Sequence, residues 1–514
     1  MKKAKTFAEG EKKKAAKAQE LAIRRQKEDE ERQKVLDDAK KVVIEEDTSL
    51  PKAVKIKLYN KDVKLRKVDA KGGSEDNEAG QRVRVFGRVH RARKQKDMLF
   101  ITLRDGYGFL QVIAAGKLAK SYDALTLTLE SSIEVTGEMY EVPHGAHAPD
   151  NRELHADFFR IIPWGKAAGG DDAITNRVSK DTDHSILMDL RHLTLRGETA
   201  SALMEVRDAV EWAFNQVYHE LRLRKVSPPA LVQCMVEGGS TLFGLKYYNE
   251  EAYLTQSSQL YLETCLPSLG DVYCIEKSFR AEKSLTRRHL AEYTHIEAEL
   301  DFITFDDLLD HLETVMCRVI EVTLSDPIIK GHVMKLNPEF QMPTKPFTRM
   351  TYVDAIKWLN EHEIMNEDGK PHQFGDDIAE AAERKMTDEI NRPIFLTHFP
   401  VEIKSFYMMK DKEDKRVTES VDCLMPGVGE IVGGSMRIYD YDELMAAYER
   451  EHLDPSPYYW YTDQRKYGGS PHGGYGLGLE RFLAWLCKQH TVRDTSLYPV
   501  RYPDMELLQV LCSY

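Results

Sequence analysis

One segment of the sequence, residues 277–302, carries side chains that could hold a polyphosphate. It reads KSFRAEKSLTRRHLAEYTHIEAELDF, and its first part predicts a strand with Arg280 and Glu282 on one face. An arginine beside a carboxylate is most often a structural ion pair, but with a triphosphate bound it can hold the α-phosphate as charge builds there. Alternating residues share a face in the second part of the predicted hairpin, namely Tyr293, His295, Glu297 and Glu299.

A second segment, SVDCLMPGVGEIVGGSMRI (420–438), supplies carboxylates in Asp422 and Glu430. Two carboxylates near phosphates suit Mg²⁺, which takes one or two of them together with phosphate oxygens. A third segment, PHGGYGLGLERFLAWL (471–486), packs glycines ahead of a predicted helix that has Arg481 in its first turns. It has neither the dinucleotide fingerprint nor a Walker loop, and taken alone it favours a packed glycine turn with a surface arginine.

The strands and helices expected to position these residues indicate a protein of the α+β class. Five short strands are expected between residues 82 and 163, with DGYG (105–108) as a hairpin turn. The oligonucleotide-binding (OB) barrel has this number of strands. Residues 197–221 predict an amphipathic helix, and mixed strands and helices follow it.

Shifts in composition divide the chain into five expected parts. Residues 1–50 form a charged helical or disordered arm, 51–80 a short extension and linker, and 81–164 the OB barrel. Residues 165–190 form a second linker, and 191–514 a large mixed domain. For the arm two interpretations stay open, a solvated helix or tail and a basic arm that touches RNA.

The three segments together resemble a known family. In order, FRAE…RRH…E, GEIVGGSMR and GLGLERF resemble motifs two and three of the class II aminoacyl-tRNA synthetases, and EWAFNQVYHELRLRKVSPPAL resembles motif one. The preceding barrel makes residues 80–499 similar to the aspartyl, asparaginyl and lysyl subgroup. The resemblance implies a catalytic domain on an antiparallel sheet flanked by helices. It also implies a homodimer whose interface includes the motif-one helix and Pro229.

The resemblance also implies a reaction in two steps. An amino-acid carboxylate attacks the α-phosphate of ATP and releases pyrophosphate, and the 3′ end of a tRNA then attacks the adenylate. Three residues would be catalytic: Arg280 on the α-phosphate, Glu282 at the adenine side or the tRNA end, and Arg481 on the γ-phosphate. Such chemistry depends mostly on positioning and charge neutralisation.

The remaining ATP contacts are carried over from the same motifs. Arg288 and His289 lie in the loop over the triphosphate, and Tyr293 stacks on adenine. The set expected to bind ATP is Arg280, Glu282, Arg288, His289, Leu290, Tyr293, Glu430, Gly478 and Arg481. Glu430 would carry Mg²⁺, with Asp422 as a second ligand, and Gly433 stands where the family often has a hydroxyl.

The residues expected around the amino acid favour asparagine. By resemblance Gln259 faces the substrate, and Leu262 stands where aspartyl enzymes have a lysine that neutralises the substrate carboxylate. Glu297 accepts hydrogen bonds only, so it can take the amide NH₂ of asparagine and repel aspartate. The full set is Glu237, Ser257, Gln259, Leu262, Glu297 and Arg437, with Arg437 donating to the amide oxygen and Glu237 holding the ammonium.

The stretches TRRHLAEYTHIEAE and PYYWYTDQRKYG resemble the eukaryotic-type cytosolic asparaginyl enzymes closely. The expected partners are therefore L-asparagine, tRNA(Asn) and a second copy of the chain, in the cytoplasm. The rivals are an aspartyl enzyme, a synthetase-like binding module without catalysis, and an asparagine synthetase of the same ancestry, which lacks the barrel. In the barrel, Phe100 and Gln111 occupy positions that meet the central anticodon base. Stacking of Phe100 on that base is favoured over a place in the core.

Composition and charge distribution fit this interpretation. The net charge of −12 argues at first against a nucleic-acid partner. The first 104 residues, however, hold 30 basic and 18 acidic residues, and the other 410 hold 42 and 66. The positive charge therefore lies on the arm and the first barrel strands. No apolar run approaches 18 residues, no signal peptide is expected, and seven scattered cysteines indicate reduced thiols.

Overall fold

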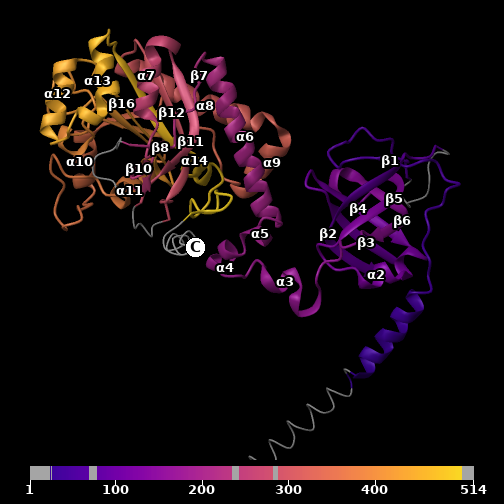
Figure 1. Ribbon diagram of the computed structural model, residues 1–514. Helices are drawn as coiled ribbons and strands as arrows, with labels where there is room; N and C mark the ends of the chain where they lie inside the picture. The colour runs from indigo at the N-terminus through magenta and orange to yellow at the C-terminus, as the bar shows by residue number, and fades with distance from the viewer. Residues whose placement is uncertain (1–23, 25, 69–77, 234–241, 282–286, 501–514) are drawn as a thin grey trace, which may run out of the picture. The chain divides into compact units, whose positions relative to one another are not determined.

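A computed structural model describes residues 24, 26–68, 78–233, 242–281 and 287–500. The chain forms two compact units, Met1–His184 and Ser185–Tyr514, and their boundary falls inside the linker predicted at 165–190 (Figure 1). The first unit is a β-barrel and the second is a helix-flanked sheet, so the predicted α+β class is confirmed. In the described part of the chain, no helix is both long and apolar enough to cross a membrane.

The barrel consists of the five strands that the sequence predicts. Its strands follow the order β2-β3-β4-β6-β5, β2 pairs with β5 to close it, and β1 adds to β2 in parallel. The bounds are β1 Val54–Lys55, β2 Arg82–Gln95, β3 Met98–Arg104, β4 Phe109–Ala115, β5 Ser132–Glu141 and β6 Arg152–Ile161, with short helices α2 Tyr122–Thr126 and α3 Ile174–Arg177.

Alternation of buried apolar and outward-facing residues is clearest in β3 and β4 of the barrel. In β3, Leu99, Ile101 and Leu103 point inward and are at most 5% exposed, whereas Phe100 and Thr102 lie on the outer face. At the predicted DGYG turn the backbone N–H of Tyr107 donates to Asp105 Oδ1 at 2.9 Å, and Gly106 has φ +91°. The period of two thus decides which side chains face outward.

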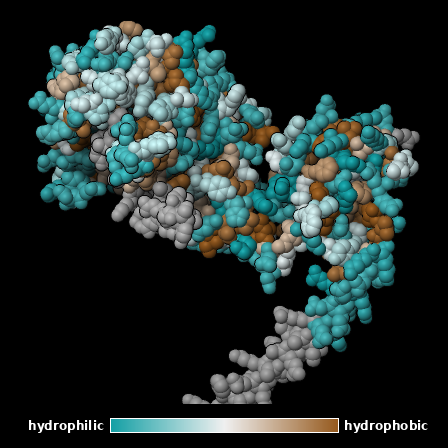
Figure 2. Space-filling model, viewed as in Figure 1, coloured by the Kyte–Doolittle hydropathy of each residue, from teal (hydrophilic) through white to brown (hydrophobic). Residues whose placement is uncertain are grey.

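The described part of the arm contains a helix, and residues 40–50 after it are turns and irregular backbone. Residues 26–39 form a helix with nearly every side chain exposed. Figure 2 shows this segment as almost uniformly hydrophilic. An exposed, charged helix is what the composition favours, and contact of the arm with RNA stays a prediction.

The second unit is built on an eight-stranded, mainly antiparallel sheet. Its order is β13-β14-β15-β16-β17-β12-β11-β7, and a separate three-stranded sheet has the order β8-β10-β9. The bounds are β7 Arg224–Lys225, β8 Leu231–Val232, β9 Gly244–Tyr247, β10 Glu250–Leu254, β11 Val272–Phe279, β12 Glu292–Asp301, β13 Thr348–Thr351, β14 Ile394–Thr397, β15 Ser420–Met425, β16 Gly429–Met436 and β17 His472–Gly478.

Helices flank this sheet, and the helix predicted at 197–221 is α6 (Figure 1). The bounds are α4 His184–Asp189, α5 Arg191–Thr194, α6 Glu198–Glu220, α7 Gln259–Leu269, α8 Phe305–Ser325, α9 Pro327–Leu336, α10 Tyr352–Glu361, α11 Glu380–Ile390, α12 Tyr441–Arg450, α13 Tyr459–Lys466 and α14 Leu479–Leu486. Apolar side chains of α6, α8 and α14 pack with those of the central strands in the main hydrophobic core.

β12 divides its residues between this core and the opposite face of the sheet. Ile296, Ala298 and Leu300 are in the core, while the intervening polar residues point to the other side. The glycine-rich segment is the neighbouring strand β17 and not the packed turn that it suggests alone. A Cβ at Gly474 would collide with Glu299, and one at Gly476 with His295. The glycines of β17 therefore leave room for the polar side chains of β12.

Arg207 connects α6 to the start of α14 behind β12. Its Nη1 donates to Glu480 Oε1 at 2.9 Å and its Nη2 donates to Thr294 Oγ1 at 2.7 Å. Glu480 also accepts the backbone N–H of Thr294 at 3.0 Å. These bonds fix α14 against β12, one residue before Arg481.

Candidate active site

The polar face of the sheet opens into a cavity of about 470 Å³ that brings the predicted site residues together. β12, β16 and β17 form its floor, and residues after β11 and after β14 form its walls. The predicted residues that line it are Ser257, Gln259, Arg280, Arg288, His289, Leu290, Tyr293, Glu297, Asp422, Glu430, Arg437, Gly478 and Arg481. The sequence places these residues far apart, and the antiparallel sheet joins them.

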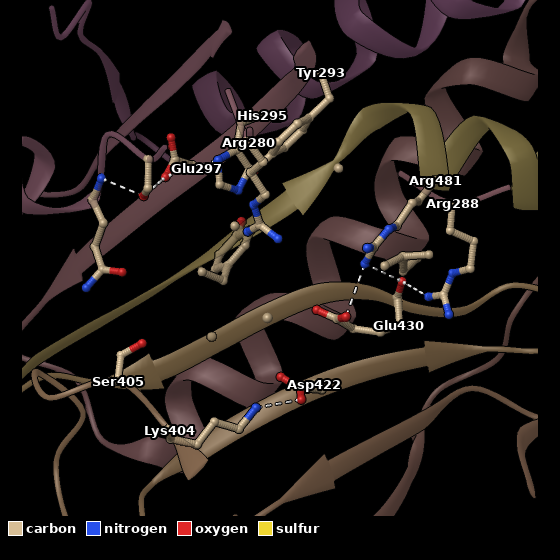
Figure 3. A pocket seen from close by; sticks show the side chains of 18 of the residues that line it. Arg280, Arg288, Tyr293, His295, Glu297, Lys404, Ser405, Asp422, Glu430 and Arg481 are labelled. Atoms are coloured by element: carbon tan, nitrogen blue, oxygen red, sulfur yellow. Dashed lines mark hydrogen bonds and ion pairs between the residues drawn. The ribbon is translucent and has the colours of Figure 1, made fainter. Parts of the chain in front are cut away.

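Arg280, Arg288 and Arg481 line the part of the cavity that we call the arginine end; Figure 3 shows Arg288 and Arg481 beside Glu430, and Arg280 beside Tyr293. The Arg280 guanidinium lies 5.6 Å from the Tyr293 ring centroid. Arg481 Nη1 donates to Glu430 Oε2 at 3.1 Å, and Arg288 Nη2 donates to the Glu430 backbone oxygen at 3.0 Å. This end combines positive charge with an aromatic face, and such a combination suits a nucleoside triphosphate.

Glu430 and Asp422 form the acidic wall of the cavity. Burial raises the pKa of Glu430, but Arg481, Lys404, Arg288 and Arg280 outweigh it and lower that pKa to about 2. Asp422 accepts from Lys404 Nζ at 2.7 Å. A Cβ at Gly433 would meet Glu430 Oε1 at 3.4 Å and Asp422 Oδ1 at 3.5 Å, so the absent side chain leaves both carboxylates accessible.

Glu383 of α11 lies behind this wall. Burial and the nearby negative charges of Glu430 and Asp422 raise its pKa to about 8. No cluster of three His, Cys, Asp or Glu side chains that could hold a metal occurs among the described residues. A cation held here would therefore need oxygen ligands from a bound substrate in addition to Asp422 and Glu430.

Ser257, Gln259, Glu297 and Arg437 form the opposite, inner end of the cavity. Glu297 accepts from the hydroxyl of Ser257 and, at 2.9 Å, from the backbone N–H of Ser258. These bonds fix the carboxylate, which is 3% exposed, so that it presents only acceptor oxygens.

Arg437 is held from two sides at the inner end. Its Nε donates to Glu299 Oε1 at 3.2 Å and its Nη1 donates to Ser435 Oγ at 2.6 Å. Burial opposes the charge of Arg437, but Glu299 outweighs it and raises the pKa of the guanidinium. Burial raises the pKa of Glu299, with Arg437 opposing and Glu263 adding to the effect.

Sequence reasoning missed residues on two elements. Lys404, Ser405, Tyr407 and Met408 line the cavity from the segment after β14, which has no pattern that marks it as part of a site. Glu263 of α7 is buried behind Gln259 and Arg437. Its position one residue after Leu262 is the only signal in the sequence that could have pointed to it.

Leu262 is a correction to the predicted set of amino-acid contacts. It does not line the cavity, because α7 turns it into an apolar cluster with Leu266, Val272 and Cys274. Glu237 and Glu282, predicted at the amino acid and at the nucleotide, lie outside the described residues.

On the barrel, Phe100 and Gln111 share the outer face of β3 and β4. Phe100 is half-buried and lies outside the core, with the Arg93 guanidinium 5.5 Å from its ring centroid. Gln111 Nε2 donates to Glu153 Oε2 at 2.9 Å. The core position weighed as the alternative for Phe100 is therefore wrong, and the ring is accessible for stacking.

Pro229 follows α6 and β7 on the surface of the second unit and is exposed. On α6 itself the Trp212 side chain is 69% exposed. An aromatic side chain exposed to this degree is typical of residues that contact a partner. The predicted dimer interface at Pro229 stays a prediction.

Comparison with protein families gives matches for each part of the chain. The family model described as "tRNA synthetases class II (D, K and N)" matches residues 183–502, and "OB-fold nucleic acid binding domain" matches residues 83–162. The arm matches "Asparaginal-tRNA synthetase, N-terminal domain" over residues 1–51.

Individual proteins are similar over nearly the whole chain. "Asparagine--tRNA ligase, cytoplasmic" of Saccharomyces cerevisiae is 55% identical over 97% of this chain and 87% of its own length, and the Homo sapiens protein of that name is 52% identical over 91% and 82%. A solved Entamoeba histolytica asparaginyl-tRNA synthetase in complex with asparaginyl-adenylate has a TM-score of 0.79 at 44% identity, covering 88% of this chain and 99% of that one. A Pyrococcus horikoshii asparaginyl-tRNA synthetase with the same adenylate has a TM-score of 0.76 at 35% identity, over 83% and 96%.

Proposed function

The chain belongs to the class II aminoacyl-tRNA synthetases, in the branch of the asparagine–tRNA ligases, and from this premise we propose which of its residues carry out asparagine ligation. The enzyme activates L-asparagine with ATP and transfers it to the 3′ end of tRNA(Asn). The observation that carries the proposal is the cavity itself. Three arginines, a fixed acceptor, a donor and two carboxylates, one of which pairs with Arg481, line the same cavity.

ATP binds at the arginine end. Tyr293 offers its ring to the adenine, and Arg280 neutralises the α-phosphate as the asparagine carboxylate attacks it. The new bond joins a carboxylate oxygen to the α-phosphorus, and the bond to the β-phosphate oxygen breaks to release pyrophosphate. Arg481 and Arg288 take the charge of the β- and γ-phosphates, and they exchange their present contacts with Glu430 for phosphate oxygens. Glu282, carried over from the motif, acts on the adenine or the tRNA end.

Glu430 and Asp422 are proposed to hold the Mg²⁺ that accompanies ATP. Their carboxylates are hard oxygen donors that approach one another across Gly433, and triphosphate oxygens would complete the ligand set. The ion, when bound, neutralises phosphate charge and orients the leaving pyrophosphate. Arg481 and Lys404 keep Glu430 ionised, whereas burial raises the pKa of Asp422 to about 6 although Lys404 opposes it.

Asparagine binds at the inner end with its carboxylate toward Arg280. Arg437 donates to the amide oxygen, and Glu297, which cannot donate when ionised, accepts from the amide NH₂. Gln259 and Ser257 line the same end, and Glu237 is carried over from the motif as a partner of the ammonium. The 2′- or 3′-hydroxyl of the terminal ribose then attacks the adenylate carbonyl, and AMP leaves.

The barrel is proposed to read the anticodon. Phe100 stacks on the central base and Gln111, held by Glu153, presents its amide to the base edge. The positive charge of the first 104 residues favours RNA at this unit. We further propose a homodimer through α6 and Pro229, and a cytoplasmic location like that of the named relatives.

ATP–pyrophosphate exchange tests the proposal directly. The purified chain should exchange label with asparagine and at most weakly with aspartate, and it should charge tRNA(Asn). Exchange with aspartate alone would instead indicate an aspartyl enzyme. No exchange with either amino acid, with RNA binding retained, would indicate a binding module. Sedimentation at concentrations around the working range separates monomer from dimer.

A further inference from the structure

We propose that Glu263 of α7 makes the site selective for a neutral amino-acid side chain. The inference rests on the proposed function, because it takes Arg437 as the residue that contacts the side-chain amide. Glu263 does not itself line the cavity. It lies directly behind two residues that do, Gln259 and Arg437, and acts through them.

The Glu263 carboxylate is enclosed by donors. Its Oε2 accepts from Arg465 Nη2 at 2.7 Å and lies 2.9 Å from His472 Nε2. Its Oε1 accepts from Gln259 Nε2 at 3.1 Å and lies 4.0 Å from Arg437 Nε. The side chain has no solvent exposure, so these donors must replace the water that an ionised carboxylate requires.

His472 faces acceptors with both ring nitrogens. Its Nδ1 lies 2.7 Å from the backbone oxygen of Ser470, which can only accept, and its Nε2 faces the Glu263 carboxylate. Both nitrogens therefore carry a hydrogen, which makes His472 an imidazolium. Glu263 is then the counter-ion of two buried cations, His472 and Arg465, and Arg465 also donates to the Tyr461 hydroxyl at 2.8 Å.

The pairing of buried cations with buried carboxylates decides which amino-acid side chain the cavity binds beside Arg437. Glu299 pairs with Arg437 and Glu263 pairs with Arg465, so each guanidinium has a buried carboxylate beside it. A neutral carboxamide fits such a surface. An aspartate carboxylate would find no cation without a partner, and burying it would be costly. Glu263 therefore disfavours an aspartate side chain, although it does not line the cavity. The apolar Leu262 points away from the cavity and cannot have this effect.

The variant Glu263→Gln removes the negative charge and keeps the shape. It leaves both Arg465 and His472 without their carboxylate, so the ratio of kcat/KM for asparagine to that for aspartate should fall by about tenfold or more in pyrophosphate exchange. The KM for ATP should stay within about twofold, since the arginine end is untouched. Glu263→Asp keeps the charge and should keep the preference. An unchanged ratio in active Glu263→Gln enzyme would overturn the proposal.

A charge-compensated pair separates this role from a purely structural one. His472→Gln combined with Glu263→Gln removes one positive and one negative charge and should restore the asparagine preference. A structural role predicts instead a further loss with no return of preference, and that result would contradict the inference. Glu313→Gln is the matched control, because Glu313 is also buried but accepts from the Phe347 backbone N–H away from the cavity. If the parent enzyme shows no exchange with asparagine, the proposed function itself fails.

Discussion

Arg481 and Glu430 pair with each other at 3.1 Å across the arginine end of the cavity. The arginine proposed for the γ-phosphate is thus held by the carboxylate proposed for the metal ion. Both groups stay charged and in place, and the incoming triphosphate with its cation can exchange partners with them one for one. The site is preorganised by the same charges that are proposed to bind the substrate.

Replacing Arg481 by alanine should weaken ATP binding more than asparagine binding. A charged hydrogen bond is worth about 1.5–3 kcal/mol, so the KM for ATP should rise by about 10- to 150-fold. Pyrophosphate exchange at varied ATP measures this. The exposed Arg416, which pairs with Asp414 on the surface, gives the control variant Arg416→Ala. Equal effects of the two substitutions would refute a specific role for Arg481.

Arg280→Ala should abolish adenylate formation without unfolding the protein. Loss of one preorganised donor to a developing charge costs about 100- to 1,000-fold in kcat. The rate of exchange at saturating ATP and asparagine reports this, and circular dichroism reports the fold. Arg280→Lys restores the charge but not the planar fork and should recover only part of the rate. Near-normal exchange by the alanine variant would exclude the α-phosphate role.

Leu262→Lys should destabilise the protein and leave amino-acid preference as it is. The side chain packs against Leu266, Val272 and Cys274 with no exposure, so an ammonium there would be buried without a partner. We expect a loss of about 3–5 kcal/mol in the free energy of unfolding, measured by urea denaturation. Leu262→Met should cost less than about 1.5 kcal/mol. A stable lysine variant that prefers aspartate would show that position 262 contacts the substrate after all.

Glu383 should make stability depend on pH between about 4.5 and 8. Its pKa is about 8 in the folded protein, against 4.5 as its ordinary value, so the folded state binds the extra proton and stability falls as pH rises through this window. Glu383→Gln removes the titration, so its Tm relative to the parent should rise from pH 5 to pH 8. The exposed Glu389 on the same helix supplies the control Glu389→Gln. A Tm difference that stays constant over this range would contradict the assignment.

Phe100→Ala should weaken charging of tRNA and spare the first step. Stacking of one base contributes about 1–3 kcal/mol, so the KM for tRNA should rise by about 5- to 150-fold, while pyrophosphate exchange stays unchanged. The control is Phe86→Ala, which removes a half-buried ring near Lys55 on a different strand of the barrel. A comparable loss from both variants would point to barrel stability and not to base stacking.

Much of the site could be predicted because alternation in a strand is a local property. The four polar residues of β12 share one face whatever surrounds them, so Tyr293, His295, Glu297 and Glu299 could be assigned together. The five barrel strands follow from the same period of two. The directions in which the side chains of α7 point could not be assigned in this way. Packing against β11 places Leu262 in an apolar cluster and leaves Glu263 outside it.

Contacts between segments that are far apart in the sequence also could not be predicted from it. Lys404 reaches Asp422 from an irregular stretch with no periodicity, and Glu263 meets residues some 200 positions away, Arg465 and His472. The glycines of β17 suggested a turn in the sequence. They are needed because the side chains of His295 and Glu299 on the neighbouring strand leave no room for a Cβ, and the sequence of β17 does not show this. Such features follow from tertiary packing, which no single segment encodes.

The bonds from Arg207 to Glu480 and Thr294 have a consequence for how the protein opens. They join α6, β12 and α14 into one cooperative unit. Arg481 directly follows Glu480, the residue of α14 that makes these bonds. Amide hydrogens at the start of α14 should therefore exchange only when the central sheet opens, not by fraying of a short helix. The γ-phosphate contact is then lost together with the core of the second unit, and heat inactivation should coincide with the unfolding of that unit.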